Sequence, residues 1–314
     1  MDSRRSHCCR DRFGIDAGGR PRGRRPKPAR RHYEGQKVIT VRGGDLTATI
    51  DPARGAKICS LLGADGTEWL SQGDPERAAG RGRVFVDAEM RGWDECAPSI
   101  VGCRIDGRNV PDHGDLWDRE FEVADDTVRA IGDSLGYRFE RRIRPTIAGL
   151  RLEYRATALE RRMPFLWAAH PQFDAPAGTR VEVPASVARV VDVLDPATPT
   201  VDWDPLLATI DSVAAGGCRK LYADPGFPVN EARLVRPDGA ELGMRWSAAC
   251  PYLGLWFDAG AYSPVPVIAI EPSTGYFDSL ETAVRMDRVP VLDKGDSLAW
   301  WVDLEPIGYA LRHA

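Results

Sequence analysis

Short runs of alternating apolar and charged residues, separated by turn-forming residues, fill the chain from about Lys37 onward. The two clearest runs are Tyr137–Ile143 and Leu150–Ala156. Because successive side chains of a β-strand point to opposite faces, such runs are typical of half-buried antiparallel strands. An Asp65-Gly66 pair between two of the runs indicates a hairpin turn. Further runs of this kind are Leu46–Ile50, Ile58–Leu62, Thr67–Leu70, Phe121–Val123 and Leu298–Leu304.

Helical signals are scarce. We expect one short helix over 205–215, because Asp204 suits its N-cap and Pro205 its first position. The 31 Gly and 24 Pro among 314 residues fit many short strands joined by turns. No apolar run approaches the roughly 18 residues that a membrane span needs. The sequence therefore predicts an all-β protein, with one domain over 36–314 built from two large packed antiparallel sheets.

Positive charge is concentrated at the N-terminus. Residues 1–33 carry ten Arg and one Lys against three Asp, whereas the rest of the chain holds 31 basic and 43 acidic side chains. We expect residues 1–35 to be a basic, disordered extension, because they offer few apolar side chains to pack. Alternatives for this segment are a nucleic-acid-binding tail, a transit peptide, or an extension upstream of a start near Val38. The acidic remainder predicts no nucleic-acid partner and no membrane partner.

The seven cysteines are irregularly spaced, and no two of them form a Cys-x-x-Cys pair. An odd number with such spacing suits neither a disulfide framework nor a structural zinc site. We therefore expect no metal centre, apolar packing roles for most of the thiols, and a reducing cytoplasmic location.

Two histidines and one glutamate stand where acid–base chemistry could be presented. His113 lies in a segment rich in Pro, Asp and Gly, and His170 ends an apolar run. Glu271 follows the four apolar residues Val267–Ile270. Burial disfavours the charged form of a carboxyl, so we expect a raised pKa for Glu271, as suits a base near neutral pH. For each residue alone, a structural or solvated position fits the local pattern as well.

The segment Arg91–Ser99 offers further polar side chains. It places Arg91, Asp94 and Glu95 around a Trp in a turn-rich sequence. Carboxylates and guanidinium groups can hydrogen-bond sugar hydroxyls, and an indole ring can stack on the apolar face of a sugar. A solvated loop explains the same pattern equally well.

Together these segments resemble the aldose 1-epimerase (galactose mutarotase-like) superfamily over most of residues 36–314. A His-Gly pair at His113, a His-Pro pair at His170 and a Glu-Pro pair at Glu271 follow one another at spacings of roughly 60 and 100 residues. The early Gly55-Ala56 pair and the Asp65-Gly66 hairpin also agree. The stretches GWDECAPSI, PDHGDLWDREFEV and IAIEPSTGYFDSLETA resemble a bacterial branch rather than the well-studied galactose enzymes.

The resemblance implies a two-sheet β-sandwich and an isomerase that needs no metal or cofactor. By motif, His170 would be the general acid that protonates the pyranose ring oxygen. Glu271 would be the base that takes the proton of the C1 hydroxyl, and His113 would bind the sugar and help to polarise the ring oxygen. Opening to the free aldehyde, rotation of C1 and closure on the other face would exchange the anomers.

The resemblance also implies residues that contact the substrate, but the motifs that assign them are less specific. Arg91, shortly before the His-Gly pair, is the candidate for the superfamily's substrate-binding Arg, with Asp94 or Glu95 as its companion. Trp256 could stack on a sugar face, although a role as a core aromatic fits equally. The superfamily's middle Asp has no clear counterpart, and Asp224 is the candidate for it.

Three other functions stay open. A non-catalytic carbohydrate-binding protein of the same fold would not need an acid and a base together. A hexose-6-phosphate epimerase would need clustered basic residues at its site, and the chain offers Arg138, Arg141, Arg142 and Arg144. A metal-dependent sugar isomerase or lyase would need metal ligands, and the chain offers Asp112, His113, Asp115, His170 and Glu271.

In all three cases the partner is a small-molecule sugar. The sequence does not distinguish a monomer from a dimer.

Overall fold

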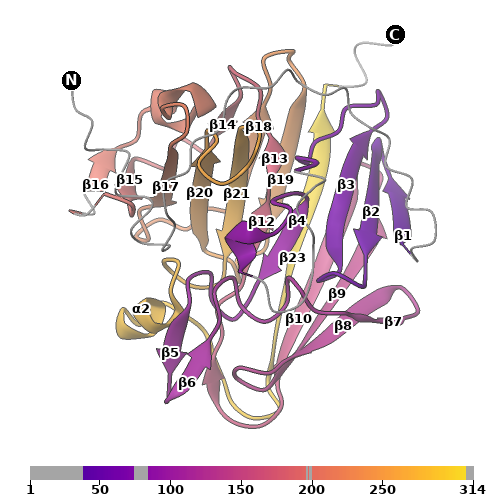
Figure 1. The fold of residues 1–314 in the computed structure, drawn as a ribbon, viewed down its shortest axis with the longest axis vertical. Coiled ribbons are helices and arrows are strands. Elements are labelled where there is room, and N and C mark those ends of the chain that lie inside the picture. Colours follow the sequence, from indigo (N-terminus) through magenta and orange to yellow (C-terminus); the bar gives the residue numbers. More distant parts are fainter. Residues whose placement is uncertain (1–37, 74–83, 196, 198–199, 309–314) are drawn as a thin grey trace.

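The alternating runs form antiparallel strands, as predicted. The computed structural model describes residues 38–73, 84–195, 197 and 200–308, and nearly all regular structure in them is β-strand (Figure 1). The proposed basic extension, residues 1–35, lies outside the described residues. Two large sheets and two strand pairs account for all the described strands, so the all-β fold class is confirmed.

The larger sheet has 11 strands, and the candidate site residues lie on its central strands. Its last member, β13 (Phe173–Asp174), pairs with β21 outside the main path. The main path runs in the order β1 (Ile39–Gly43), β2 (Leu46–Asp51), β3 (Lys57–Gly63), β4 (Trp93–Cys96), β12 (Ala168–Pro171), β21 (Val267–Ser273), β20 (Tyr252–Asp258), β17 (Cys218–Ala223), β15 (Arg189–Asp192) and β16 (Thr200–Asp202).

The second sheet has eight strands, and it includes the two most strictly alternating runs. Its order is β14 (Arg180–Glu182), β18 (Glu231–Val235), β19 (Glu241–Trp246), β23 (Ser297–Ile307), β10 (Leu150–Ala158), β9 (Tyr137–Pro145), β8 (Thr127–Gly132) and β7 (Glu122–Ala124). The two strand pairs are β5 (Cys103–Ile105) with β6 (Arg108–Val110), and β11 (Met163–Pro164) with β22 (Val291–Leu292).

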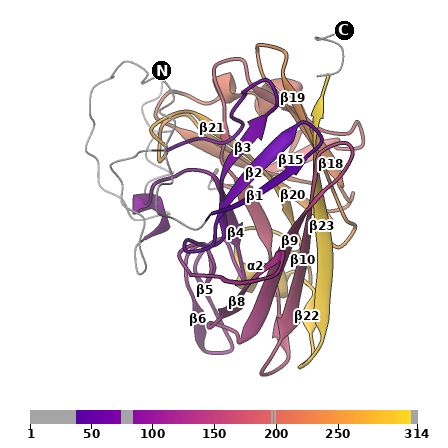
Figure 2. The same ribbon diagram turned by 90° about the vertical axis from the view of Figure 1, so that its right-hand side faces the viewer.

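The two large sheets pack as layers, seen from the side in Figure 2, and an aromatic cluster lies between them. Tyr154 of β10 and Trp300 of β23 contact Trp167, which precedes β12, and Phe139 of β9 contacts Tyr154. The rings of Tyr154 and Trp300 stack with centroids 5.3 Å apart. Because alternate residues of these strands point outward, one face of each strand builds this core while the other carries charge.

The helix expected over 205–215 is wrong in detail. The segment forms two short 3-10 helices, η2 (Pro205–Ala208) and η3 (Ile210–Ser212), and Thr209 between them is extended. Thr209 forms an isolated bridge to Arg180 of β14, and this tertiary pairing interrupts the helix. The expected cap is present, because the Asp204 carboxylate accepts a hydrogen bond from the backbone N–H of Leu206 at 2.9 Å.

Other short elements complete the fold. Residues Thr67–Leu70 make isolated bridges instead of the expected strand, whereas the Asp65-Gly66 turn is present, with Gly66 at φ +86°. The described residues include one further 3-10 helix, η1 (Phe85–Asp87), and one α-helix, α2 (Leu280–Arg285), capped by Ser279. No helix in the described part of the chain has the length and apolar character to cross a membrane.

Candidate active site

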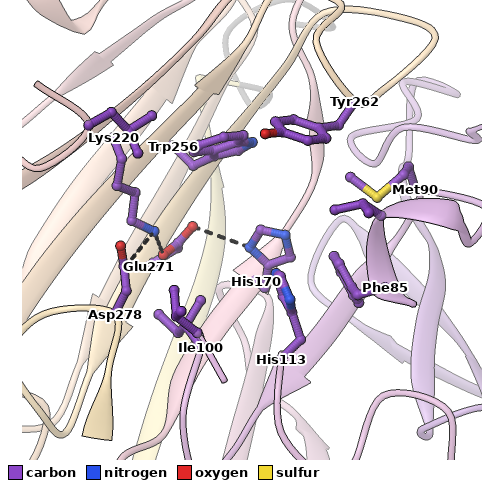
Figure 3. Close-up of a pocket in the computed structure, with 13 residues that line it drawn as sticks. Phe85, Met90, Ile100, His113, His170, Lys220, Trp256, Tyr262, Glu271 and Asp278 are labelled. Atoms are coloured by element: carbon purple, nitrogen blue, oxygen red, sulfur yellow. Dashed lines mark hydrogen bonds and ion pairs between the residues drawn. The ribbon is translucent and has the colours of Figure 1, made fainter. Parts of the chain in front are cut away.

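A pocket opens over the central strands of the 11-stranded sheet (Figure 3). Strands β12, β17, β20 and β21 each contribute a side chain to it. Aromatic and aliphatic side chains make up most of its wall, among them Phe85, Met90, Ile100, Trp256 and Tyr262. Its polar lining residues are His113, His170, Lys220, Glu271 and Asp278.

His170 and Glu271 are brought together by neighbouring strands. β12 and β21 pair antiparallel, and the two side chains emerge on the same face of the sheet. Nδ1 of His170 lies 3.2 Å from Oε1 of Glu271. A carboxylate can only accept, so this contact places a proton on Nδ1 of His170. Nε2 of the same ring is then the nitrogen that can hydrogen-bond a ligand.

Lys220 of β17 is a site residue that the sequence analysis missed. Its Nζ contacts Oε2 of Glu271 and lies 3.6 Å from Oδ1 of Asp278. Asp278 in turn accepts a hydrogen bond of 2.6 Å from the hydroxyl of Tyr222. In the sequence, Lys220 directly follows Arg219 in a short strand, so nothing local distinguishes it from a solvated lysine.

The charge state of Glu271 differs from the sequence expectation. Burial raises the pKa of Glu271, but attraction to the Lys220 ammonium and the hydrogen bond from His170 outweigh it and lower the pKa from 4.5 to about 2. The expected raised pKa is therefore wrong, because a strand-end pattern does not reveal the cation from another strand. Burial lowers the pKa of Lys220, and the attraction of Glu271 and Asp278 raises it further than burial lowers it.

His113 reaches the pocket from a tight loop. His113 has φ +57° and Gly114 φ +75°, and a Cβ on Gly114 would lie 1.9 Å from the carbonyl oxygen of Ala97. The His113 ring stacks on Phe85 with centroids 3.7 Å apart. Nδ1 of His113 lies 2.8 Å from the Asp112 carboxylate. Each pocket histidine thus has a carboxylate at Nδ1.

Glu95 does not reach the pocket, which corrects its assignment as a substrate ligand. It follows Asp94 on β4, so the two side chains point to opposite faces of the sheet. Glu95 lies fully buried between the sheets. Its oxygens accept hydrogen bonds from Arg141 Nη1 at 2.6 Å, Trp167 Nε1 at 2.7 Å and the Tyr154 hydroxyl at 3.2 Å.

Asp94 and Arg91 lie beside the pocket without lining it. Asp94 is the register partner of His170, but its carboxylate is buried and lies 3.0 Å from Nζ of Lys57. Burial raises the pKa of Asp94 despite this lysine. The Arg91 side chain is also buried, with Nε 3.5 Å from the Glu89 carboxylate. Their assignment to substrate binding therefore stays a prediction.

Of the remaining candidates, Trp256 lines the pocket and Asp224 does not. The Trp256 and Tyr262 rings lie 5.9 Å apart on one side of the pocket. Asp224 instead pairs with Arg189 at 2.6 Å and accepts a hydrogen bond from the backbone of Gly226. The carboxylate of Asp278 does line the pocket, and its backbone oxygen accepts hydrogen bonds from the N–H groups of Ile100 and Val101.

Two sites considered from the sequence, a metal site and a phosphate site, are not formed by the described residues. Among the described residues, no three His, Cys, Asp or Glu side chains are grouped so that they could hold a metal ion. Arg141 points into the core, whereas its neighbours on β9 are directed outward from the eight-stranded sheet. None of these arginines lines the pocket, so they form no phosphate site there.

No protein-family model and no curated protein matches the chain. Solved structures match it in shape. Slr1438 protein from Synechocystis sp. PCC 6803 has a TM-score of 0.69 at 18% identity, over 86% of this chain and 96% of that one. A galactose mutarotase-like protein from Lactobacillus casei ATCC 334 has 0.65 at 22%, over 86% and 99%. A galactose mutarotase-like protein from Clostridium acetobutylicum has 0.63 at 14%, over 88% and 96%.

These likenesses establish the fold. The chain adopts the β-sandwich of galactose mutarotase-like proteins, as the resemblance in the sequence implied. Because a fold hosts more than one function, the activity has to be argued from the pocket.

Proposed function

We propose that this protein is an aldose 1-epimerase-like isomerase that interconverts the anomers of a sugar. The observation that carries the proposal is the contact between His170 and Glu271 inside a pocket with aromatic walls. Anomer exchange needs a proton donor at the ring oxygen and an acceptor at the C1 hydroxyl. A protein that only binds sugar has no need of both.

In the proposed reaction, His170 acts as the imidazolium and donates its Nε2 proton to the ring oxygen. The bond between C1 and that oxygen breaks, the C1 hydroxyl becomes the aldehyde, and Glu271 accepts the hydroxyl proton. The acidity of this proton rises steeply as the ring opens, so even a carboxylate with a pKa of about 2 can accept it. After C1 rotates, closure returns both protons along the same paths and leaves each side chain in its starting state.

The other lining residues have supporting roles in this proposal. Nε2 of His113 hydrogen-bonds the sugar, since its Nδ1 is engaged by Asp112. Trp256 and Tyr262 offer ring faces to the apolar side of a pyranose. Asp278 accepts a hydrogen bond from a sugar hydroxyl, in the role first sought in Asp224.

A neutral aldose fits this pocket better than a hexose 6-phosphate. Among the described residues that line the pocket, Lys220 is the one cation besides the histidines. It lies between the carboxylates of Glu271 and Asp278, so its charge is already matched. A phosphate group brought to it would face two carboxylates.

Anomer exchange measured by NMR tests the function. We expect the purified protein to accelerate exchange for at least one sugar in a panel of neutral aldoses and their 6-phosphates. Glu271→Gln should lose about 100-fold or more of this acceleration, as for a removed general base. The matched control Glu122→Gln changes an exposed carboxylate on β7 and should keep the rate.

The outcomes separate the candidate functions. Selective line broadening of one sugar without acceleration would favour a carbohydrate-binding protein. Acceleration confined to 6-phosphates would favour a hexose-6-phosphate epimerase. Acceleration that survives Glu271→Gln would remove Glu271 from the role of base.

A further inference from the structure

Lys220 occupies an unusual place for a lysine. Its side chain is 5% exposed, and it extends from β17 across the sheet face to the carboxylate of Glu271 on β21 (Figure 3). A buried ammonium without a partner loses its proton readily. Here two carboxylates flank it, Glu271 in direct contact and Asp278 at 3.6 Å. Lys220 is therefore built into the site as a fixed positive charge.

The contacts of Glu271 divide between its two oxygens. Oε2 faces the ammonium of Lys220, and Oε1 faces Nδ1 of His170. A carboxylate has about four lone-pair positions, so each oxygen keeps room for a further donor. The two contacts fix the plane of the carboxylate on the pocket wall. A Glu271 without Lys220 would be held from one side only.

We propose that Lys220 is a positioning residue, which holds Glu271 as an anion and turns one of its oxygens toward His170 throughout the working pH range. The inference rests on the proposed function in so far as Glu271 is the base of an epimerase. It adds a residue that neither touches the reacting atoms nor appears in the sequence motifs. Its contribution is to keep the base available at every pH at which the protein is folded.

The surroundings of Glu271 single out Lys220 for this role. His170 is the other group that can carry positive charge beside Glu271, and its own proton is needed for the reaction. Asp278 is a carboxylate whose charge acts on Lys220 from the other side. The titratable groups that face Glu271 are His170 on β12, Cys96 on β4, Lys220 and Tyr222 on β17, and Asp278 after β21.

The pH dependence of the rate follows from this arrangement. With Lys220 in place, Glu271 should stay ionised and cause no acidic limb in the rate above about pH 5. In Lys220→Met, the ammonium no longer offsets burial, which raises the pKa of Glu271. An acidic limb should then appear at pH 4.5 or above, at least two pH units above the wild-type value near 2. Lys220→Arg keeps the cation and should keep the wild-type profile.

Carboxyl ¹³C NMR tests the same point without any activity. The Glu271 signal is identified as the one missing from the Glu271→Gln protein. We expect it to stay at its ionised position down to about pH 4 in the wild type, and to titrate above that pH in Lys220→Met. An ionised Glu271 at pH 4 in Lys220→Met would overturn the proposal. An epimerase that fails to appear would leave this titration intact, so the two proposals fail separately.

Lys57→Met is the matched control. Lys57 is a second buried lysine, 4% exposed, and it pairs with Glu89 and Asp94 instead of Glu271. Its loss should leave the Glu271 titration where it is in the wild type, although both variants lower the melting temperature. Lys220→Gln, which removes the charge but keeps a donor, replaces Lys220→Met if the latter does not fold. An equal shift of the Glu271 signal in Lys57→Met would show a general effect of lost charge and would contradict the specific role.

Discussion

Two buried glutamates in this molecule have the same chemistry and opposite settings. Glu95 lies in the closed core between the sheets, where Arg141, Trp167 and Tyr154 donate to it. Glu271 lies on the pocket wall, where Lys220 and His170 contact it. Burial raises the pKa of Glu95 and attraction to Arg141 only partly offsets it, whereas for Glu271 the attractions prevail.

The difference teaches what separates a structural carboxylate from one that can do chemistry. The donors around Glu95 are Arg141 and Tyr154 of the second sheet and Trp167 before β12, and they enclose it, so its contacts tie β4 to β9 and β10. The contacts of Glu271 come from one sheet and leave its open side on the pocket. Desolvation raises the pKa at both sites, and the surrounding attractions and hydrogen bonds outweigh it only at Glu271.

Removal of the core cation should have the largest effect. Arg141→Met leaves the Glu95 charge buried without its partner, and we expect a loss of about 3–5 kcal/mol in the free energy of unfolding. Urea denaturation measures this loss. The control Arg142→Met removes the next arginine of β9, which is partly exposed and pairs with Asp126, and should change stability by less than about 1 kcal/mol. Equal losses in the two variants would mean that the buried pair of Arg141 and Glu95 stabilises the fold no more than a surface ion pair does.

The two carboxylates should also differ in how stability depends on pH. The pKa of Glu271 is lower in the folded protein, so its contribution is full above about 4.5 and is lost as the pH falls toward 2. The stability difference between the wild type and Glu271→Gln should therefore shrink by about 3 kcal/mol over this interval.

The corresponding difference for Glu95→Gln should move the other way. The pKa of Glu95 is raised in the folded protein, so the wild type should gain stability relative to Glu95→Gln as the pH falls from neutrality. Urea midpoints of the three proteins between pH 7 and pH 2 supply the comparison. Parallel trends for both variants would contradict the assigned directions.

The fold was predictable because its signal is local. Alternation in Tyr137–Ile143 and Leu150–Ala156 reports directly which side chains face the core, and β9 and β10 have those faces. The segment 205–215 failed for the opposite reason. Its cap at Asp204 is local and correct, but the bridge between Thr209 and Arg180 that divides the helix is a tertiary contact.

The site was predictable only where motifs mark it. His113, His170 and Glu271 stand in recognisable dipeptides, and the fold brings all three to one pocket. Glu95 looked like a sugar ligand because its neighbours are polar, yet a one-residue step along β4 turns it to the other face. No motif in the local sequence identifies Lys220 or Asp278. Lys220 belongs to the site because it contacts Glu271, 51 positions away, and Asp278 because it accepts a hydrogen bond from Tyr222 on another strand.

The smallest expected effects come from the removal of two tyrosine hydroxyls. One donates a hydrogen bond to Glu95 in the core, and the other donates to Asp278 at the pocket. Tyr154→Phe removes a 3.2 Å hydrogen bond to Glu95, and we expect a loss of about 1 kcal/mol in stability with no change in KM. Tyr222→Phe removes the 2.6 Å hydrogen bond to Asp278, whose side chain is 19% exposed and can be hydrated instead. Its stability should fall by less, while KM for the sugar rises about two- to tenfold as Asp278 becomes free to turn. A KM effect in Tyr154→Phe, or none in Tyr222→Phe, would contradict the division between core and pocket.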